Sequence, residues 1–293
     1  MRCLLRVRPI ALILSLLLSY CALPVAWGGA AGASAPRSER SNCDRSAFRV
    51  VVDVGHTADV PGVRSARGVP EYDFNLRLAK LIEQSLLDAG FSRTVLLITA
   101  DPPPRGLIER VARARKLRAD LFLSIHHDGV PDRFLEKWEY EGQEHSFSDR
   151  FKGHSIFISN DNGDRRGSLL YGRLLGQQLK ARGLQYTPHY TEPMMDGRRR
   201  QLVDAEAGVY RYDQLIVLKE NAIAAVLLEA GSIVNRDEEL ILAGAERQAL
   251  ISAAAVDAVE RFCAVRSRQH HDRPARFRRM REVHGGQLRT GTP

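Results

Sequence analysis

FRVVVDVGH, residues 48–56, is an apolar, strand-like run that ends on a glycine and a histidine. Two further runs have the same form and also lead to a polar residue: residues 121–125 before His126, and residues 224–228 before Glu229. Open α/β sheets bind ligands beyond the carboxyl ends of their strands, so groups placed there converge even when they are far apart in sequence. Glu71 joins them from a loop just ahead of an expected helix. The sequence therefore predicts one site made of His56, Glu71, His126 and Glu229.

Strand-like and helix-like segments alternate from residue 48 to residue 265. This alternation is typical of an α/β fold, a mostly parallel twisted sheet with helices on both faces. The expected strands are residues 48–54, 94–98, 121–125, 154–159 and 224–228. The expected helices run from an N-cap at Asp73 to a stop at Gly90, around residues 107–114, and over residues 167–181 and 237–262. We expect a single catalytic domain, residues 48–265.

Two long stretches interrupt this alternation. Residues 129–153 are rich in charged and aromatic side chains and directly follow the His126 run. Connections of this length are uncommon unless they form a lid or a binding loop. Residues 183–213 are the second stretch, and they include a run of three arginines at 198–200 that we expect to be solvated. Each stretch either borders the site or is a surface excursion with a small core of its own.

The predicted site has the composition of a catalytic metal centre. Two imidazoles and one carboxylate are a ligand set of catalytic zinc, which keeps a fourth position open for water. The remaining carboxylate is then free to act on that water. Asp53, Asp128, His154 and His189 are candidate supporting groups, and Asp53 equally suits a role in fixing the first turn. The pattern predicts a hydrolase with one Zn²⁺ per chain.

Four motifs in this chain resemble those of a known family. They are DVGH at 53–56, EYDFNL at 71–76, SIHHD at 124–128 and LEAG at 228–231. In order and spacing they are similar to the zinc-dependent N-acetylmuramoyl-L-alanine amidases, which cut peptidoglycan, and the resemblance covers residues 48–262. Two residues depart from the family pattern: Val54 stands at a usual proline, and Ser232 stands where an apolar aromatic residue commonly follows the glycine.

The resemblance implies roles for the four site residues. His56, Glu71 and His126 are implied to be zinc ligands, and Glu229 the catalytic carboxylate. His127 competes with His126, but adjacent residues on a strand point to opposite faces, so only one faces the metal. Strand register and the family motif both favour His126. The implied reaction is hydrolysis of the amide between N-acetylmuramic acid and L-alanine. The alternatives are another zinc amide hydrolase or peptidase acting on wall peptides, and a catalytically silent wall-binding regulatory module.

The first 35 residues have the form of a secretory signal peptide, with arginines, an apolar run at 10–18 and then small residues. Two alternatives are an uncleaved anchor and a lipoprotein at Cys21, although Tyr20 is bulky for a lipoprotein signal. Residues 36–47 are the expected linker. We therefore expect an exported protein, periplasmic or associated with the cell wall, with no stable membrane span after the signal is removed.

The net charge of +8 is concentrated at the two ends of the chain. Three arginines near the start contribute +3, and residues 266–293 contribute +6 from eight arginines and two acids, which leaves −1 for the rest. The catalytic domain is thus close to neutral, and no nucleic-acid partner is expected. The basic tail, 266–293, is expected to be disordered. The expected partners are peptidoglycan and an activator protein. No separate wall-binding domain is evident, so targeting is expected to come from the catalytic domain, the tail or a partner protein.

Two cysteines, Cys43 and Cys263, remain after removal of the signal peptide. Cys43 precedes the first expected strand, and Cys263 lies near the end of the last expected helix. If that helix packs antiparallel to the strand, the two cysteines meet at one edge of the layer. An exported protein also meets the oxidising conditions that allow a disulfide. We therefore expect these two cysteines to be paired.

Overall fold

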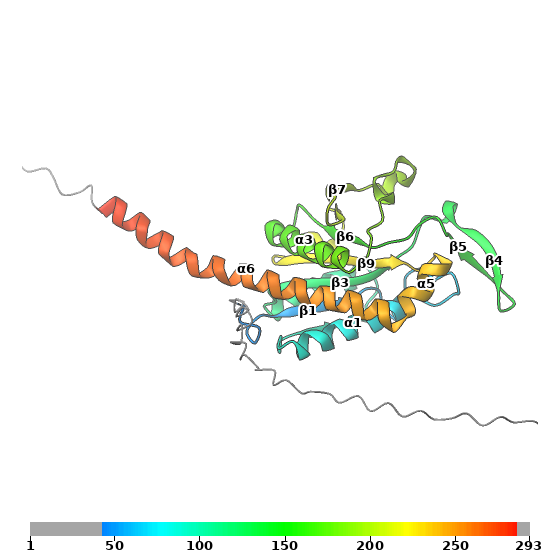
Figure 1. Cartoon of the computed structure of the whole chain (residues 1–293), viewed down its shortest axis with the longest axis horizontal. Coiled ribbons are helices and arrows are strands. Elements are labelled where there is room, and N and C mark those ends of the chain that lie inside the picture. Colours follow the sequence, from blue (N-terminus) through cyan, green and yellow to red (C-terminus); the bar gives the residue numbers. More distant parts are fainter. Residues whose placement is uncertain (1–42, 286–293) are drawn as a thin grey trace, which may run out of the picture. The chain divides into compact units, whose positions relative to one another are not determined.

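The computed structural model describes residues 43–285, with side chains described up to residue 269. A sheet of seven strands lies at its centre, in the order β2-β1-β3-β9-β6-β8-β7 (Figure 1). The strands are β1 (Val50–Val54), β2 (Val95–Leu97), β3 (Leu121–Asp128), β6 (Ser155–Ile158), β7 (Gln201–Asp204), β8 (Val209–Arg211) and β9 (Ala224–Ser232). Neighbouring strands are parallel except β6 with β9 and β7 with β8. The predicted mostly parallel α/β sheet is confirmed.

Helices cover both faces of this sheet, as predicted. They are α1 (Glu71–Asp88), α2 (Arg105–Lys116), α3 (Arg165–Ala181), α4 (Ile216–Lys219), α5 (Arg236–Ala243) and α6 (Ala245–Gly285). In β1 the alternate residues Val50, Val52 and Val54 join the core cluster that includes residues of α1, α3 and α6. Val51 points the other way, into the cluster that includes residues of α2 and α4. The period-two alternation of strand side chains therefore supplies two separate cores.

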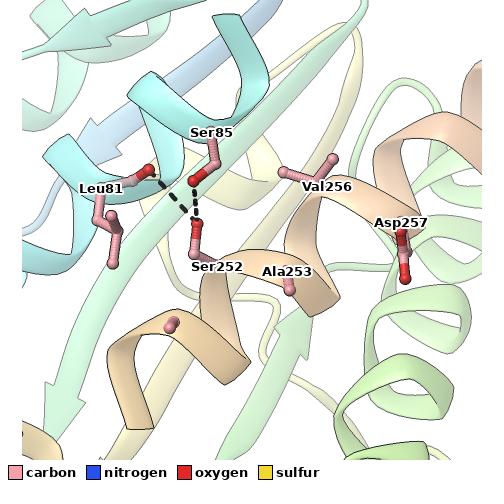
Figure 2. A pocket seen from close by; sticks show the side chains of 7 residues that line it. Leu81, Ser85, Ser252, Ala253, Val256 and Asp257 are labelled. Carbon is pink, nitrogen blue, oxygen red and sulfur yellow. Dashed lines mark hydrogen bonds between the residues drawn. The ribbon is translucent and has the colours of Figure 1, made fainter. Parts of the chain in front are cut away.

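Several contacts tie the last helix to the rest of the fold, among them a disulfide and a pair of serines. The expected disulfide is confirmed, because Cys43 is bonded to Cys263 with the two Cα atoms 5.2 Å apart. Nearer the start of the helix, the Ser252 hydroxyl lies 2.9 Å from the Ser85 hydroxyl and donates at 3.4 Å to the carbonyl of Leu81 (Figure 2). These contacts hold α6 against α1 and against the segment that leads into β1.

Two predicted helix boundaries are wrong. Helix α1 begins at Glu71 and its N-cap is Pro70, so Asp73 lies inside the first turn rather than capping it. Carboxylates in a first turn are favoured by the helix dipole, which explains why Asp73 looked like a cap. The helix expected over residues 237–262 is two helices, because Gly244 has extended backbone angles between α5 and α6. Glycine is a poor helix former, and the break lets the chain change direction there.

Helix α6 extends past Cys263 to Gly285, into the basic tail. The disorder expected of residues 266–293 stays a prediction. Residues 1–42 and 286–293 lie outside the described residues, and so do the predicted signal peptide, most of the predicted linker and the end of the tail.

Within residues 43–285, no helix combines the length and the apolar character needed to cross a membrane.

The two interrupting stretches take different forms. Residues 129–153 hold a short 3-10 turn, η1 (Asp132–Phe134), and a hairpin of β4 (Glu136–Tyr140) and β5 (Gln143–Phe147), which forms a sheet of its own (Figure 1). Residues 183–213 begin with two 3-10 turns, η2 (His189–Thr191) and η3 (Pro193–Arg198), and end as β7 and β8. The second stretch is therefore only partly an excursion, because its last strands extend the main sheet.

Candidate functional site

His56 lies two residues after the end of β1 and has a φ of 66°, in the left-handed region. The residue before it must be glycine for a packing reason. A Cβ atom added at Gly55 would lie 2.4 Å from Nε2 of His126, far inside contact distance. The absence of this Cβ lets the two imidazole rings approach to 4.9 Å between centroids. The turn after β1 thus brings His56 and His126 together although they are 70 residues apart.

Glu71, the first residue of α1, bridges these two histidines. Its Oε2 lies 2.9 Å from Nε2 of His56, and its Oε1 lies 3.0 Å from Nδ1 of His126. The carboxylate is buried. Burial by itself raises the pKa of Glu71, but hydrogen bonds to His126 and His56 outweigh it and hold the pKa far below its usual value. The ligand atoms of the three residues all lie within 4.8 Å of one another.

Asn75, one turn further along α1, fixes this arrangement. Its amide nitrogen donates to Oε1 of Glu71 at 3.1 Å and to the carbonyl of Gly55 at 3.2 Å. Its amide oxygen lies 2.8 Å from Nδ1 of His127. His127 is buried, and burial lowers its pKa to about 3, so it is neutral and can donate to that oxygen. The two adjacent histidines therefore have different surroundings: His126 faces Glu71, and His127 faces Asn75.

A buried arginine supports the turn from behind. Arg110 of α2 forms a 2.6 Å ion pair with Asp53, and it also donates to the carbonyls of Val54 and His56. Ser124 donates a second hydrogen bond to Asp53 at 2.7 Å. Asp53 thus acts on the first turn through Arg110, which is the second of the two roles considered for it. These hydrogen bonds fix the backbone of the turn that carries the His56 side chain.

Glu229 lies beside the histidine pair because β3 and β9 are neighbours in the sheet. The strand register places Glu229 directly opposite His126. Its Oε2 atom is buried and has no hydrogen-bond partner among the described residues. Burial raises its pKa well above the usual value, and the nearby carboxylates Asp128 and Glu71 raise it further. Glu229 is therefore a carboxyl group that can hold a proton and has one oxygen free for another group.

Asp128 connects this centre to the second stretch. The Tyr190 hydroxyl of η2 lies 2.7 Å from both carboxylate oxygens of Asp128, and Nε2 of His189 lies 3.7 Å from one of them. His189 in turn lies 2.5 Å from the hydroxyl of Thr187. Two of the candidate supporting groups, Asp128 and His189, are thus part of one network. This part of residues 183–213 borders the site, one of the two alternatives considered for it.

His154, the fourth candidate supporting group, is placed differently. It lies just before β6 and forms an isolated backbone bridge with Tyr186. Burial lowers its pKa to about 4, and its Nδ1 atom has no hydrogen-bond partner among the described residues. These contacts fit a neutral histidine packed between β6 and the following segment.

A family model described as N-acetylmuramoyl-L-alanine amidase matches residues 50–261 of this sequence. The chain belongs to the N-acetylmuramoyl-L-alanine amidase family. The family and the peptidoglycan amidase activity predicted from the four motifs are therefore confirmed. A search of curated protein sequences finds no match.

Solved structures of amidases share the fold of this amidase. Ami1 from Mycobacterium smegmatis is 18% identical, with a TM-score of 0.58, covering 75% of this chain and 98% of its own. The catalytic domain of CwlV from Bacillus (Paenibacillus) polymyxa var. colistinus is 22% identical, with a TM-score of 0.52 and coverage of 73% and 97%. CwlD from Clostridioides difficile, solved in complex with the GerS lipoprotein, is 18% identical, with a TM-score of 0.53 and coverage of 74% and 99%.

The structure of this amidase adds supporting residues that sequence patterns did not single out. They are Asn75, Arg110 and Tyr190. Asn75 had a usable signal, because it follows Glu71 by four residues and so lies on the same face of the helix. Arg110 and Tyr190 had no local sequence signal, because their partners Asp53 and Asp128 lie 57 and 62 residues away along the chain.

Proposed function

We propose that this amidase is exported and zinc-dependent, and that it hydrolyses the amide between N-acetylmuramic acid and L-alanine. The observation that carries the proposal is the convergence of His56, Glu71 and His126 beside Glu229. Two imidazoles and one carboxylate, with their ligand atoms within 4.8 Å of one another, suit a zinc ion that keeps one position open. Bound zinc supplies an acidified water and polarises the amide carbonyl.

Glu229 is the proton carrier in this proposal. In its ionised form the carboxylate accepts a proton from the attacking water, and the carboxyl group so formed passes it to the nitrogen of the departing L-alanine. A group that must both take and give a proton works best with a pKa near the working pH. The raised pKa of Glu229 and its unpartnered Oε2 support this role.

The surrounding residues hold the proposed ligands in place. Asn75 keeps the Glu71 carboxylate facing the histidines, and Arg110 fixes the carbonyl of His56. Such outer contacts orient metal ligands and maintain their protonation states. The low pKa of Glu71 keeps it anionic and ready to bind a cation.

Export and a protein partner belong to the same proposal. The signal-like residues 1–35 and the Cys43–Cys263 disulfide both support an oxidising compartment outside the cytoplasm. The CwlD relative has been solved with a lipoprotein bound, which supports a partner protein for this amidase as well.

Product analysis tests the proposed cleavage. Purified mature protein, loaded with zinc, is incubated with sacculi and with soluble muropeptides, and the products are identified by mass spectrometry. The proposal predicts intact stem peptides with a free L-alanine amino group, and glycan chains without peptide. Shortened peptides that stay attached to the glycan would indicate the alternative peptidase. Substrate binding without any product would indicate the silent wall-binding module.

A further inference from the structure

A surface groove of about 960 Å³ lies between α2 and α4, and we refer to it as the α2–α4 groove. Its lining includes Ala119, just before β3, and residues 222–223, just before β9. His126 and Glu229 lie toward the other ends of these two strands. Because β3 and β9 are parallel, the groove and the catalytic centre are at opposite ends of the sheet. A segment bound in the groove would therefore leave the catalytic centre open.

The floor of the α2–α4 groove is apolar and partly exposed. Helix α2 buries Gly106, Arg110 and Ala114, which are spaced four residues apart. A second stripe of the same helix faces the groove, and Ile108 within it is 59% exposed. Single exposed apolar residues are common on protein surfaces, but a contiguous apolar surface inside a groove is typical of a binding site. The apolar lining comprises Ile108, Val111, Ala112, Ile216, Ala222 and Ile223.

Cations surround this apolar floor. The charged residues of the lining are Arg115, Lys116, Arg118, Lys219 and one acid, Glu220. Lys219 and Glu220 form an ion pair at 3.4 Å. The side chains of Arg115, Lys116 and Arg118 are exposed, and within the described part of the chain they make no hydrogen bond or ion pair. Because residues 36–265 as a whole are close to neutral, this is a local excess of positive charge.

The walls of the groove restrict what can bind there. Strands β3 and β9 are each paired on both sides, so the groove offers no strand edge to an extended peptide. Asn221 is a buried polar residue of the lining, and its amide nitrogen already donates to the carbonyl of Val217 at 2.7 Å. Small-molecule sites orient their ligands with polar groups placed inside the pocket. Here the groups left for a ligand are mainly apolar side chains on the floor and cations on the rim.

An amphipathic helix matches both of these features. A helix pairs its own backbone polar groups, so it can lie on an apolar floor without leaving them unsatisfied. Its apolar face would contact the floor, and acidic side chains on its flanks would meet the cations of the rim. A flexible polyanion has no apolar face, and a flat bilayer does not follow a concave surface.

We infer that the α2–α4 groove is the docking site for an acidic amphipathic helix of a partner protein. The inference rests on the proposed function only for the existence of a partner, and on no step of the amidase reaction. It assigns to that partner a surface away from the zinc ligands and Glu229 and states the chemistry that this surface recognises.

The first test measures binding of a designed peptide to the purified, zinc-loaded protein. The probe is a fluorescent helical peptide of about 15 residues, somewhat longer than α2, with leucines at i, i+3, i+4 and i+7 and glutamates beside them. One control peptide has the same composition in scrambled order, and another has lysine in place of glutamate. Fluorescence anisotropy should show saturable binding of the probe that weakens with added salt. Both control peptides should bind at least about 10-fold more weakly.

Four variants locate the binding surface. Ile108→Ser removes the most exposed apolar side chain of the floor, and its control is Ile241→Ser on α5, where the isoleucine is 47% exposed. Lys116→Glu reverses a charge on the rim, and its control is Lys80→Glu, at an exposed position on α1. Burial of an isoleucine side chain or reversal of a facing charge should change the Kd of the probe by about 10-fold. The two control variants should bind as the wild type does.

Three results would overturn the inference: no saturable binding of the probe, equal binding of the scrambled peptide, or wild-type binding by both groove variants. Anionic phosphatidylglycerol vesicles and polyphosphate are measured alongside. Tighter binding of either one, lost in Ile108→Ser and Lys116→Glu, would assign the groove to a bilayer or a polyanion and also overturn it.

Turnover of muropeptides is measured separately, and all four variants should keep the activity of the wild type, because none of the changed residues touches the catalytic centre. Absence of turnover in the wild type would overturn the proposed function while leaving the peptide binding as measured. Circular dichroism confirms that each variant is folded.

Discussion

The strand ends and the η2–η3 segment hold their site residues in different ways. His126 and Glu229 face each other because β3 and β9 are paired, so a ladder of backbone hydrogen bonds fixes their separation. Tyr190 and His189 sit on a short 3-10 turn that reaches the site through a few side-chain contacts. The difference teaches that the sheet places the proposed catalytic groups, and that the turns place residues that border them.

Replacing Glu229 should have the largest effect. Glu229→Gln keeps the size of the side chain but removes the proton carrier. We expect turnover of muropeptides to fall by about 10²- to 10⁴-fold, the usual contribution of a general acid–base group. Zinc content should stay that of the wild type, because Glu229 is not a proposed ligand.

The control is Glu206→Gln, an exposed carboxylate paired with Lys180 on the far end of α3, which should keep full activity. Turnover of Glu229→Gln close to that of the wild type would remove Glu229 from the mechanism. It would also contradict the claim that the paired strands place the proposed catalytic groups.

Loss of the disulfide tests how much the link between α6 and the segment before β1 stabilises the fold that carries the strand ends. Cys263→Ser opens a link between residues 220 apart and should lower the free energy of unfolding by about 2–4 kcal/mol. Thermal denaturation of the wild type with and without reductant provides the comparison. Reduced wild type and the variant should melt at the same temperature, whereas a reductant effect that persists in the variant would contradict the assignment.

The glycine before His56 tests how tightly the strand-end groups are packed. A Cβ at this position would meet the His126 ring at 2.4 Å. Gly55→Ala should therefore destabilise the fold by about 1–3 kcal/mol, the range for overpacking, and should weaken zinc binding. Gly197→Ala is the matched control, since a Cβ there meets nothing within 4 Å. Zinc affinity of Gly55→Ala equal to that of this control would show that the rings do not need this approach.

The smallest effect is expected at the turn. Tyr190→Phe removes the hydroxyl that lies 2.7 Å from both oxygens of Asp128. The free energy of unfolding should fall by about 1 kcal/mol, the low end for a buried acceptor that loses a partner, because His189 remains close to Asp128. Hydrogen exchange of residues 187–200 should become faster while zinc content is unchanged. Unaltered exchange would mean that other contacts hold the turn.

The same comparison explains how far the sequence could predict this molecule. The strand ends were predictable, because an apolar run followed by His56, His126 or Glu229 is a local pattern and parallel strands bring such ends together. The Cys43–Cys263 pair followed from the same layer geometry. The contacts of Tyr190 with Asp128 and of Arg110 with Asp53 were not predictable, because they join segments that no local pattern relates.

Some predicted helix boundaries were wrong for a related reason. Gly244 could end a helix or be tolerated inside one, and only the packing of α5 and α6 on different neighbours decides between these. In the same way, the aromatic residues of 129–153 do not reveal a hairpin until Trp138 and Phe147 are seen packing against Arg236 at the start of α5.

The most direct test of the central claim is the zinc content of two variants at neighbouring positions, His126→Ala and His127→Gln, measured beside the wild type after dialysis against a weak chelator. The account predicts about one zinc per chain in the wild type, none in His126→Ala, and retention in His127→Gln when zinc is supplied in excess. Zinc retained in His126→Ala, or lost from His127→Gln alone, would contradict a metal centre built from His56, Glu71 and His126.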